Sequence, residues 1–134
     1  MTGVQTCALP IFDRTAPTVT YSSHAASYDV DDDINITCTT ADDRSGLLPD
    51  GRMTGICGTV SNPAYAYPLG LNIVNDSAED LAGNVGISST SFEVKVTLTG
   101  LANLTTRFSQ KAGVTKSLNE KLAAATEKIG RAHV

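Results

Sequence analysis

The sequence has no tryptophan, and phenylalanine and tyrosine together make up only 5% of its 134 residues. Without large aromatic side chains, a domain of this length has to build its core mostly from small and medium aliphatic residues. The chain also lacks any apolar run close to the ~20 residues of a bilayer-spanning helix, so we expect no membrane span. Acidic residues outnumber basic ones by 14 to 10, which argues against a nucleic-acid partner.

The two ends of the chain resemble translated sequencing adapter. Residues 1–11 (MTGVQTCALPI) and 129–134 (IGRAHV) are the peptides that the two strands of a common library adapter encode. The flanking codons agree with this origin, because the adapter requires a first base T at Phe12 and a final AG at Lys128. We therefore expect residues 12–128 to be an internal fragment of a longer protein, and neither end to take part in function.

Charge divides the remaining chain into two parts. Residues 12–93 hold 12 acidic and 3 basic side chains, whereas residues 94–128 hold 2 acidic and 6 basic ones. In the first part, short runs around Val19 and Ile34 alternate apolar and polar residues between turn-forming clusters, which predicts strands. Strands at roughly ten-residue spacing with no helix between them favour an all-β sandwich over residues 12–97.

The second part changes to a helical period. Apolar residues recur at helical spacing in two runs, Leu101 to Phe108 and Leu118 to Ala125. Gly113 is a candidate stop for the first helix, and Thr115 is a candidate N-cap for the second. The sequence thus predicts a short helical hairpin over residues 98–128. Two helices of about ten residues are marginal alone, so we expect them to pack on a neighbour or to open a larger helical domain.

Two cysteines remain between the adapter-like ends, Cys38 and Cys57, which are 19 positions apart. Cys38 continues the alternation of Ile34 and Ile36, so its thiol should point into the core, where a partner from a facing strand could meet it. We expect a disulfide and hence an oxidising compartment. Two inert buried thiols are the alternative. A metal site would need more ligands than these two and His24, and a catalytic thiol would need an oriented base.

Four motifs occur in an order that resembles the immunoglobulin-like repeats of bacterial secreted and cell-surface proteins. They are DRTAP at 13–17, INITCT at 34–39, SGL at 45–47 and DLAGNVG at 80–86. The resemblance covers residues 13–97, implies a Greek-key β-sandwich used as a spacer or adhesive module, and supports pairing Cys38 with Cys57. Residues 101–125 are similar to the opening helices of the FIMAH-type helical module, which occurs in bacterial secreted hydrolases and surface proteins.

The DLAGNVG segment is predicted to form a tight turn before the last strand. Gly83 and Asn84 tolerate positive φ, and the carboxylate of Asp80 can accept hydrogen bonds from the turn amides. The turn motif consists of Asp80, Ala82, Gly83, Asn84 and Gly86. Asp76 departs from the repeat pattern, because an apolar inward residue is usual at its position. Either the strand register shifts there or the carboxylate lies at a sheet edge.

Two groups of residues are candidates for ligand binding. Acidic clusters could supply oxygen ligands to Ca²⁺, in one arrangement shared with a preceding repeat near Asp13. The candidates are Asp31, Asp33, Asp42 and Asp43. Solvated turn carboxylates are the alternative, since the sequence has no D-x-D-x-D-G loop. Tyr65 and Tyr67 share one face of a predicted strand by parity, where they could stack on sugar rings. Packing in the core or at an edge, beside Pro63 and Pro68, is the alternative.

The sequence offers no catalytic set. A Ser-His-Asp triad, a phosphate-binding glycine loop and a paired acid and base cannot be assembled, so we expect no enzyme activity and no cofactor. We expect instead a non-catalytic structural, spacer or adhesive module of a bacterial extracellular or cell-surface protein, whose partners are neighbouring domains of its parent chain. The alternative is a carbohydrate- or protein-binding accessory domain of a secreted hydrolase, stabilised by calcium, with a glycan or surface protein as partner.

Overall fold

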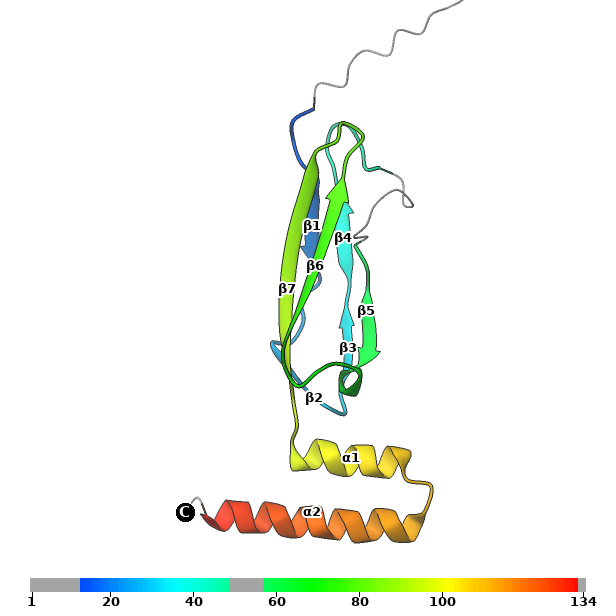
Figure 1. The fold of residues 1–134 in the computed structure, drawn as a ribbon, viewed down its shortest axis with the longest axis vertical. Helices are drawn as coiled ribbons and strands as arrows, with labels where there is room; N and C mark the ends of the chain where they lie inside the picture. The colour runs from blue at the N-terminus through cyan, green and yellow to red at the C-terminus, as the bar shows by residue number, and fades with distance from the viewer. Residues whose placement is uncertain (1–12, 49–56, 133–134) are drawn as a thin grey trace, which may run out of the picture. The chain divides into compact units, whose positions relative to one another are not determined.

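A computed structural model of the chain describes residues 13–48 and 57–132, which form seven strands, one short 3-10 helix and two α-helices (Figure 1). In chain order they are β1 (Thr18–Tyr21), β2 (Ser27–Asp29), β3 (Asp33–Ile36), β4 (Cys38–Ala41), β5 (Val60–Pro63), η1 (Ala64–Ala66), β6 (Gly70–Glu79), β7 (Val85–Lys95), α1 (Leu98–Phe108) and α2 (Ala112–Ala132). The protein is mainly β and has a helical pair near its C-terminus, as the sequence predicted.

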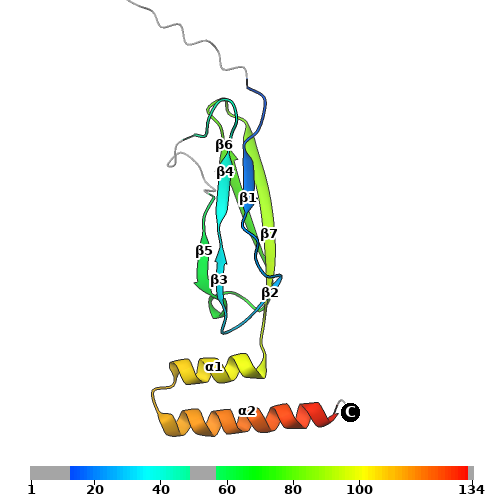
Figure 2. The same ribbon diagram turned by 180° about the vertical axis from the view of Figure 1, so that it is seen from behind.

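The described strands form three small sheets. β1 pairs with β4 and β3 pairs with β5, both antiparallel. The third sheet has the order β2-β7-β6, in which β2 runs parallel to the end of β7. β6 and β7 are the long strands, with 10 and 11 residues, and they lie side by side in both views (Figure 1, Figure 2).

The run from Ile34 to Cys38, predicted as one strand, is divided into β3 and β4. Thr37 lies between them, and its amide donates a hydrogen bond to Ser22 Oγ at 3.0 Å. Ser22 in turn donates its own amide to the Thr37 carbonyl at 2.8 Å. The predicted alternation survives the break, because Ile34, Ile36 and Cys38 are all buried.

The chain divides into two compact units. The first unit contains β1, β4 and the parts of β6 and β7 next to the turn that joins them, and its buried core consists of Val19, Cys38 and Ala78. The second contains β2, β3, β5, η1, the remaining parts of β6 and β7, and both helices. Its largest buried side chains are Phe92, Ile34, Ile36 and Val94.

α1 begins directly after β7, and its first turn is held by Asp29 at the end of β2. Thr97 is the N-cap, and its hydroxyl oxygen accepts a hydrogen bond from the Gly100 amide at 2.9 Å. The Asp29 carboxylate accepts hydrogen bonds from the Thr97 amide, at 3.0 Å, and from the Thr97 hydroxyl. Gly100 lies so close to this carboxylate that a Cβ there would approach Asp29 Oδ1 to 2.5 Å. These contacts anchor the start of α1 within the second unit.

α2 begins earlier than the sequence predicted. α1 ends at Phe108 with Ser109 as its C-cap, and α2 already includes Gly113 and Thr115. The prediction that Gly113 stops the first helix and Thr115 caps the second is therefore wrong. The Thr115 hydroxyl donates to the carbonyl of Lys111, four residues earlier, at 3.2 Å. A threonine whose hydroxyl bonds to the carbonyl four residues earlier is typical of a position within a helix.

Candidate functional site

Three aspartates from distant parts of the chain meet in the first unit, and together they form the aspartate cluster. Asp13 precedes β1, Asp42 follows β4 and Asp80 follows β6. One carboxylate oxygen of each lies within 4.8 Å of the other two. Asp80 is fully buried and Asp13 is 8% exposed, whereas Asp42 is half-buried. Three like charges at this separation repel one another unless nearby dipoles or a cation compensate them.

Asp80 is held by the turn between β6 and β7. Its Oδ1 accepts hydrogen bonds from the amides of Ala82 (2.9 Å) and Asn84 (2.8 Å), and its Oδ2 accepts one from the Asn84 side chain (2.7 Å). Gly83 has a φ of +88°, which favours glycine. The backbone of Asn84 has no positive φ. Its side-chain amide also donates to the Asp13 carbonyl at 3.2 Å, which ties the turn to the segment before β1.

Asp13 and Asp42 are also held by backbone amides. Asp13 accepts hydrogen bonds from Thr15, at 2.8 Å, and from Ser45, at 3.1 Å. Asp42 uses its Oδ2 to accept from the Gly46 amide at 2.5 Å. Its Oδ1 is buried and has no hydrogen-bond partner among the described residues. The amides therefore compensate most of the carboxylate oxygens and leave this one without a donor.

Burial and hydrogen bonding have opposite effects on the pKa of the Asp80 and Asp13 carboxyls. Burial raises the pKa of Asp80, but the hydrogen bonds from Asn84 and from the Ala82 amide outweigh this effect and bring the pKa below its usual 3.8. For Asp13, the hydrogen bond from the Thr15 amide lowers the pKa by more than burial raises it. Both side chains are therefore ionised at neutral pH, as anionic oxygen ligands have to be.

The donor set of the aspartate cluster fits a hard divalent cation. Ca²⁺ binds six to eight oxygens, from carboxylates, carbonyls and water. The cluster offers three carboxylates, and Asp42 Oδ1 is a buried oxygen that lacks a donor within the described part of the chain. The sequence named Asp42 and the neighbourhood of Asp13 for such a site. It assigned Asp80 only to the turn, because no local pattern links residues 13 and 80.

The other three calcium candidates lie apart from the cluster. Asp31 accepts a hydrogen bond from the Asn103 side chain of α1 at 2.5 Å. Asp33 begins β3 and Asp43 follows Asp42, and both are exposed. Among the described residues, none of these three aspartates belongs to a group of converging carboxylates.

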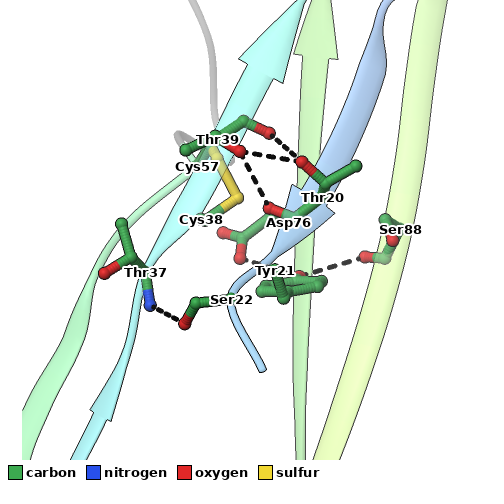
Figure 3. The surroundings of a disulfide bond; sticks show 9 residues. All are labelled: Thr20, Tyr21, Ser22, Thr37, Cys38, Thr39, Cys57, Asp76 and Ser88. Carbon is green, nitrogen blue, oxygen red and sulfur yellow. Dashed lines mark hydrogen bonds between the residues drawn. A yellow bond between two sulfur atoms is a disulfide. The ribbon is translucent and has the colours of Figure 1, made fainter. Parts of the chain in front are cut away.

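A disulfide joins Cys38 and Cys57, whose Cα atoms are 5.3 Å apart (Figure 3). Cys38 is buried beside Val19 in the core of the first unit. The predicted disulfide is confirmed, and the alternative of two free thiols at these positions is excluded. His24, considered as a base for a reactive thiol, has its Nε2 2.7 Å from the Thr90 hydroxyl.

Asp76 points inward near this disulfide and is held by Tyr21 (Figure 3). The Tyr21 hydroxyl donates to Asp76 Oδ2 at 2.8 Å, and its oxygen also lies 3.2 Å from the Ser88 carbonyl oxygen. Asp76 is only 9% exposed, so the carboxylate lies inside the unit. Burial, followed by the hydrogen bond and the charge of Asp76, raises the pKa of Tyr21 to about 12. The hydroxyl therefore stays protonated and remains a donor at neutral pH.

Tyr65 and Tyr67 do not share a strand face, and that prediction is wrong. Tyr65 lies in η1 and Tyr67 directly follows it. A 3-10 turn has three residues per turn, so side chains two positions apart project in different directions. Tyr65 packs edge-on against Phe108 of α1, and Tyr67 packs edge-on against Phe92 of β7, each with ring centroids 5.3 Å apart. Both rings thus contribute to packing within the second unit.

Comparison with family models, with curated proteins and with solved structures finds no match for this chain. Among residues 13–48 and 57–132, no helix is both long and apolar enough to cross a bilayer. The functional assignment therefore rests on the geometry of the disulfide and of the aspartate cluster.

Proposed function

We propose that the chain is an immunoglobulin-like Greek-key module, which serves as a non-catalytic spacer or adhesive segment of a bacterial secreted or cell-surface protein. The observation that carries this proposal is the Cys38–Cys57 disulfide beside the buried core of the first unit. Structural disulfides persist in oxidising compartments and are rare where thiols are kept reduced. A disulfide that packs beside the core of a small β-rich chain therefore supports a position outside the reducing cytosol.

The strand arrangement supports a sandwich. The described strands are short apart from β6 and β7, and buried residues alternate with exposed ones along β3 and the end of β7. The segment before β3 contributes β1 to one sheet and β2 to another, because β1 pairs with β4 while β2 pairs with β7. A chain that passes from one sheet to another in this way is typical of a β-sandwich, which supports this part of the proposal.

The proposed mechanism is mechanical. The disulfide links residues 19 positions apart, and an extended chain spans ~3.5 Å per residue, so about 65 Å of chain cannot extend while the bond is intact. When the module is pulled at its two ends, the disulfide therefore limits how far the unfolded chain can extend. This property suits a spacer that holds a neighbouring domain away from its attachment point.

Single-molecule force spectroscopy on the oxidised and reduced protein tests this mechanism. We expect unfolding of the reduced protein to release about 65 Å more contour length than unfolding of the oxidised protein, because reduction frees the enclosed segment. Equal extensions would contradict the proposal.

A glycan-array signal that is lost in Tyr65→Ala or Tyr67→Ala, but retained in Tyr28→Phe, would favour the carbohydrate-binding alternative.

A second candidate function is divalent-cation binding that stabilises the module. The observation that favours it is Asp42 Oδ1, a buried carboxylate oxygen that has no donor among the described residues and belongs to a group of three converging carboxylates. A bound cation would satisfy this oxygen and offset the repulsion among the three charges. Stabilisation of this kind is compatible with the spacer function.

Thermal unfolding with and without calcium tests the second candidate. Extracellular calcium modules bind with dissociation constants of about 0.1–1 mM, so ~10 mM Ca²⁺ should stabilise the folded state by about 1–3 kcal/mol and raise the melting temperature. Asp42→Asn should abolish the rise, whereas Asp43→Asn, at the exposed neighbouring position, should leave it intact. A melting temperature that does not respond to Ca²⁺ would exclude this function and leave the spacer proposal standing.

A further inference from the structure

α2 carries a heptad-like apolar stripe that α1 covers only on one side. The stripe alternates spacings of three and four residues and consists of Leu118, Leu122 and Ala125, with Thr115 before them and Ile129 of the adapter-like end after them. On the side of α1, Thr115, Asn119 and Leu122 are half-buried, and the Asn119 side chain donates to Thr106 at 3.2 Å. None of the described residues of α2 is fully buried. The helix therefore has an apolar flank without a covering element among the described residues.

The open flank consists of five residues next to the α1-facing side of α2, four of them exposed and one, Ala125, half-buried. With 3.6 residues per turn they fall within an arc of about 80°. They are Val114, Leu118, Lys121, Ala125 and Lys128. Val114 is 48% exposed and Leu118 is 43% exposed, high fractions for aliphatic side chains on an ordered helix. Soluble helices bury such stripes, so the open flank is a surface suited to a partner.

Two lysines define the charge of the open flank. Lys121 and Lys128 are seven residues apart, and each lies next to the apolar stripe. In coiled coils, the charge at this heptad position selects the partner helix. The two glutamates of α2 lie on the opposite side and pair within the helix, Glu120 with Lys116 at 4.0 Å and Glu127 with Arg131. Among the described residues, neither Lys121 nor Lys128 forms an ion pair with an acidic side chain. The open flank is therefore apolar with a basic border.

We propose that the open flank of α2 docks an acidic amphipathic helix of a partner polypeptide. The apolar side of that helix would cover Val114 and Leu118, and its glutamates or aspartates would face Lys121 and Lys128. A second copy of this chain fits less well, because it would bring the same lysines to the interface. An anionic membrane also fits less well, because the open flank has no aromatic anchor and α1 covers one side of the seam.

Two synthetic helical peptides with the same apolar seam test the proposal, one with glutamate and one with lysine at the flanking positions. Fluorescence anisotropy with the full chain should show the acidic peptide binding at least fivefold more tightly at low salt, from two ion pairs at a largely apolar interface. The difference should shrink as ionic strength rises, because salt screens exposed charges. The double variant K121E/K128E should reverse the preference, whereas Lys116→Glu, on the opposite side, should leave it unchanged.

Further variants and probes separate the possible occupants. Leu118→Asp should weaken binding of both peptides by tenfold or more, while circular dichroism shows that helix content is retained. Equal affinity for the two peptides, or no affinity for either, would overturn the proposal. Dimerisation of the chain that is lost in Leu118→Asp, or binding to phosphatidylserine vesicles in place of the acidic peptide, would also overturn it.

Discussion

Replacing Gly86 by alanine should lower the free energy of unfolding by about 3 kcal/mol, because the new methyl group has no space. A Cβ at this position would lie 1.9 Å from the carbonyl oxygen of Pro17 and 2.9 Å from its carbonyl carbon. Both are backbone atoms, so no side-chain rotation relieves the overlap, and the segment before β1 has to move away from β7. Urea unfolding followed by circular dichroism measures the loss.

The chemically identical change Gly113→Ala is the matched control. Gly113 lies in α2, and a Cβ there meets nothing within 4 Å. Alanine has the higher helix propensity, so this variant should be neutral or more stable by up to about 1 kcal/mol. If Gly86→Ala unfolds at the same urea concentration as the wild type, the close approach of Pro17 to β7 is wrong.

Gly86 also shows where sequence reasoning about the turn motif was incomplete. Its place in DLAGNVG suggested a role in the turn, yet among the described glycines of this motif only Gly83 has positive φ. Gly86 lies in β7, and the reason for its small size is the approach of a segment almost 70 residues earlier in the chain. Spacing within a motif indicates that a small residue is needed but does not identify the segment that requires it.

The same distinction between local and distant causes applies to the rest of the fold. Alternation predicted the buried positions around Ile34 and Cys38, because period two depends only on neighbouring residues. It missed the break at Thr37, which depends on hydrogen bonds to Ser22. It also placed Tyr65 on a strand, whereas a 3-10 turn positions that ring against Phe108 of α1.

The sequence predicted those parts of the candidate site that depend only on residues adjacent in the chain. The role of Asp80 as an acceptor for turn amides follows from the residues beside it. Its approach to Asp13 and Asp42 depends on how β1, β4 and β6 come together, and no period or spacing in the sequence encodes that. The inward Asp76 was recognised as unusual, but its partner Tyr21 lies 55 residues earlier and could not be named.

Removing the disulfide should cost about 3 kcal/mol of folding free energy, because the bond closes a loop of about 20 residues in the unfolded chain. The appropriate variant is Cys38→Ala with Cys57→Ala, since alanine leaves no buried hydroxyl next to Val19. A Cys7→Ala background removes the third cysteine of the sequence from thiol exchange. Small domains have stabilities of about 5–15 kcal/mol, so the loss should be a large fraction of the total.

Reductant provides the internal control for this experiment. Dithiothreitol should lower the stability of the protein that retains both cysteines to nearly that of the double variant, and it should leave the double variant unchanged. Reduction and substitution remove the same constraint on the unfolded chain. The two losses of folding free energy should therefore be equal, apart from the difference in packing between a thiol and a methyl group. If reductant has no effect, and both thiols react with an alkylating agent before reduction, the cross-link is not formed and the extracellular spacer loses its main support.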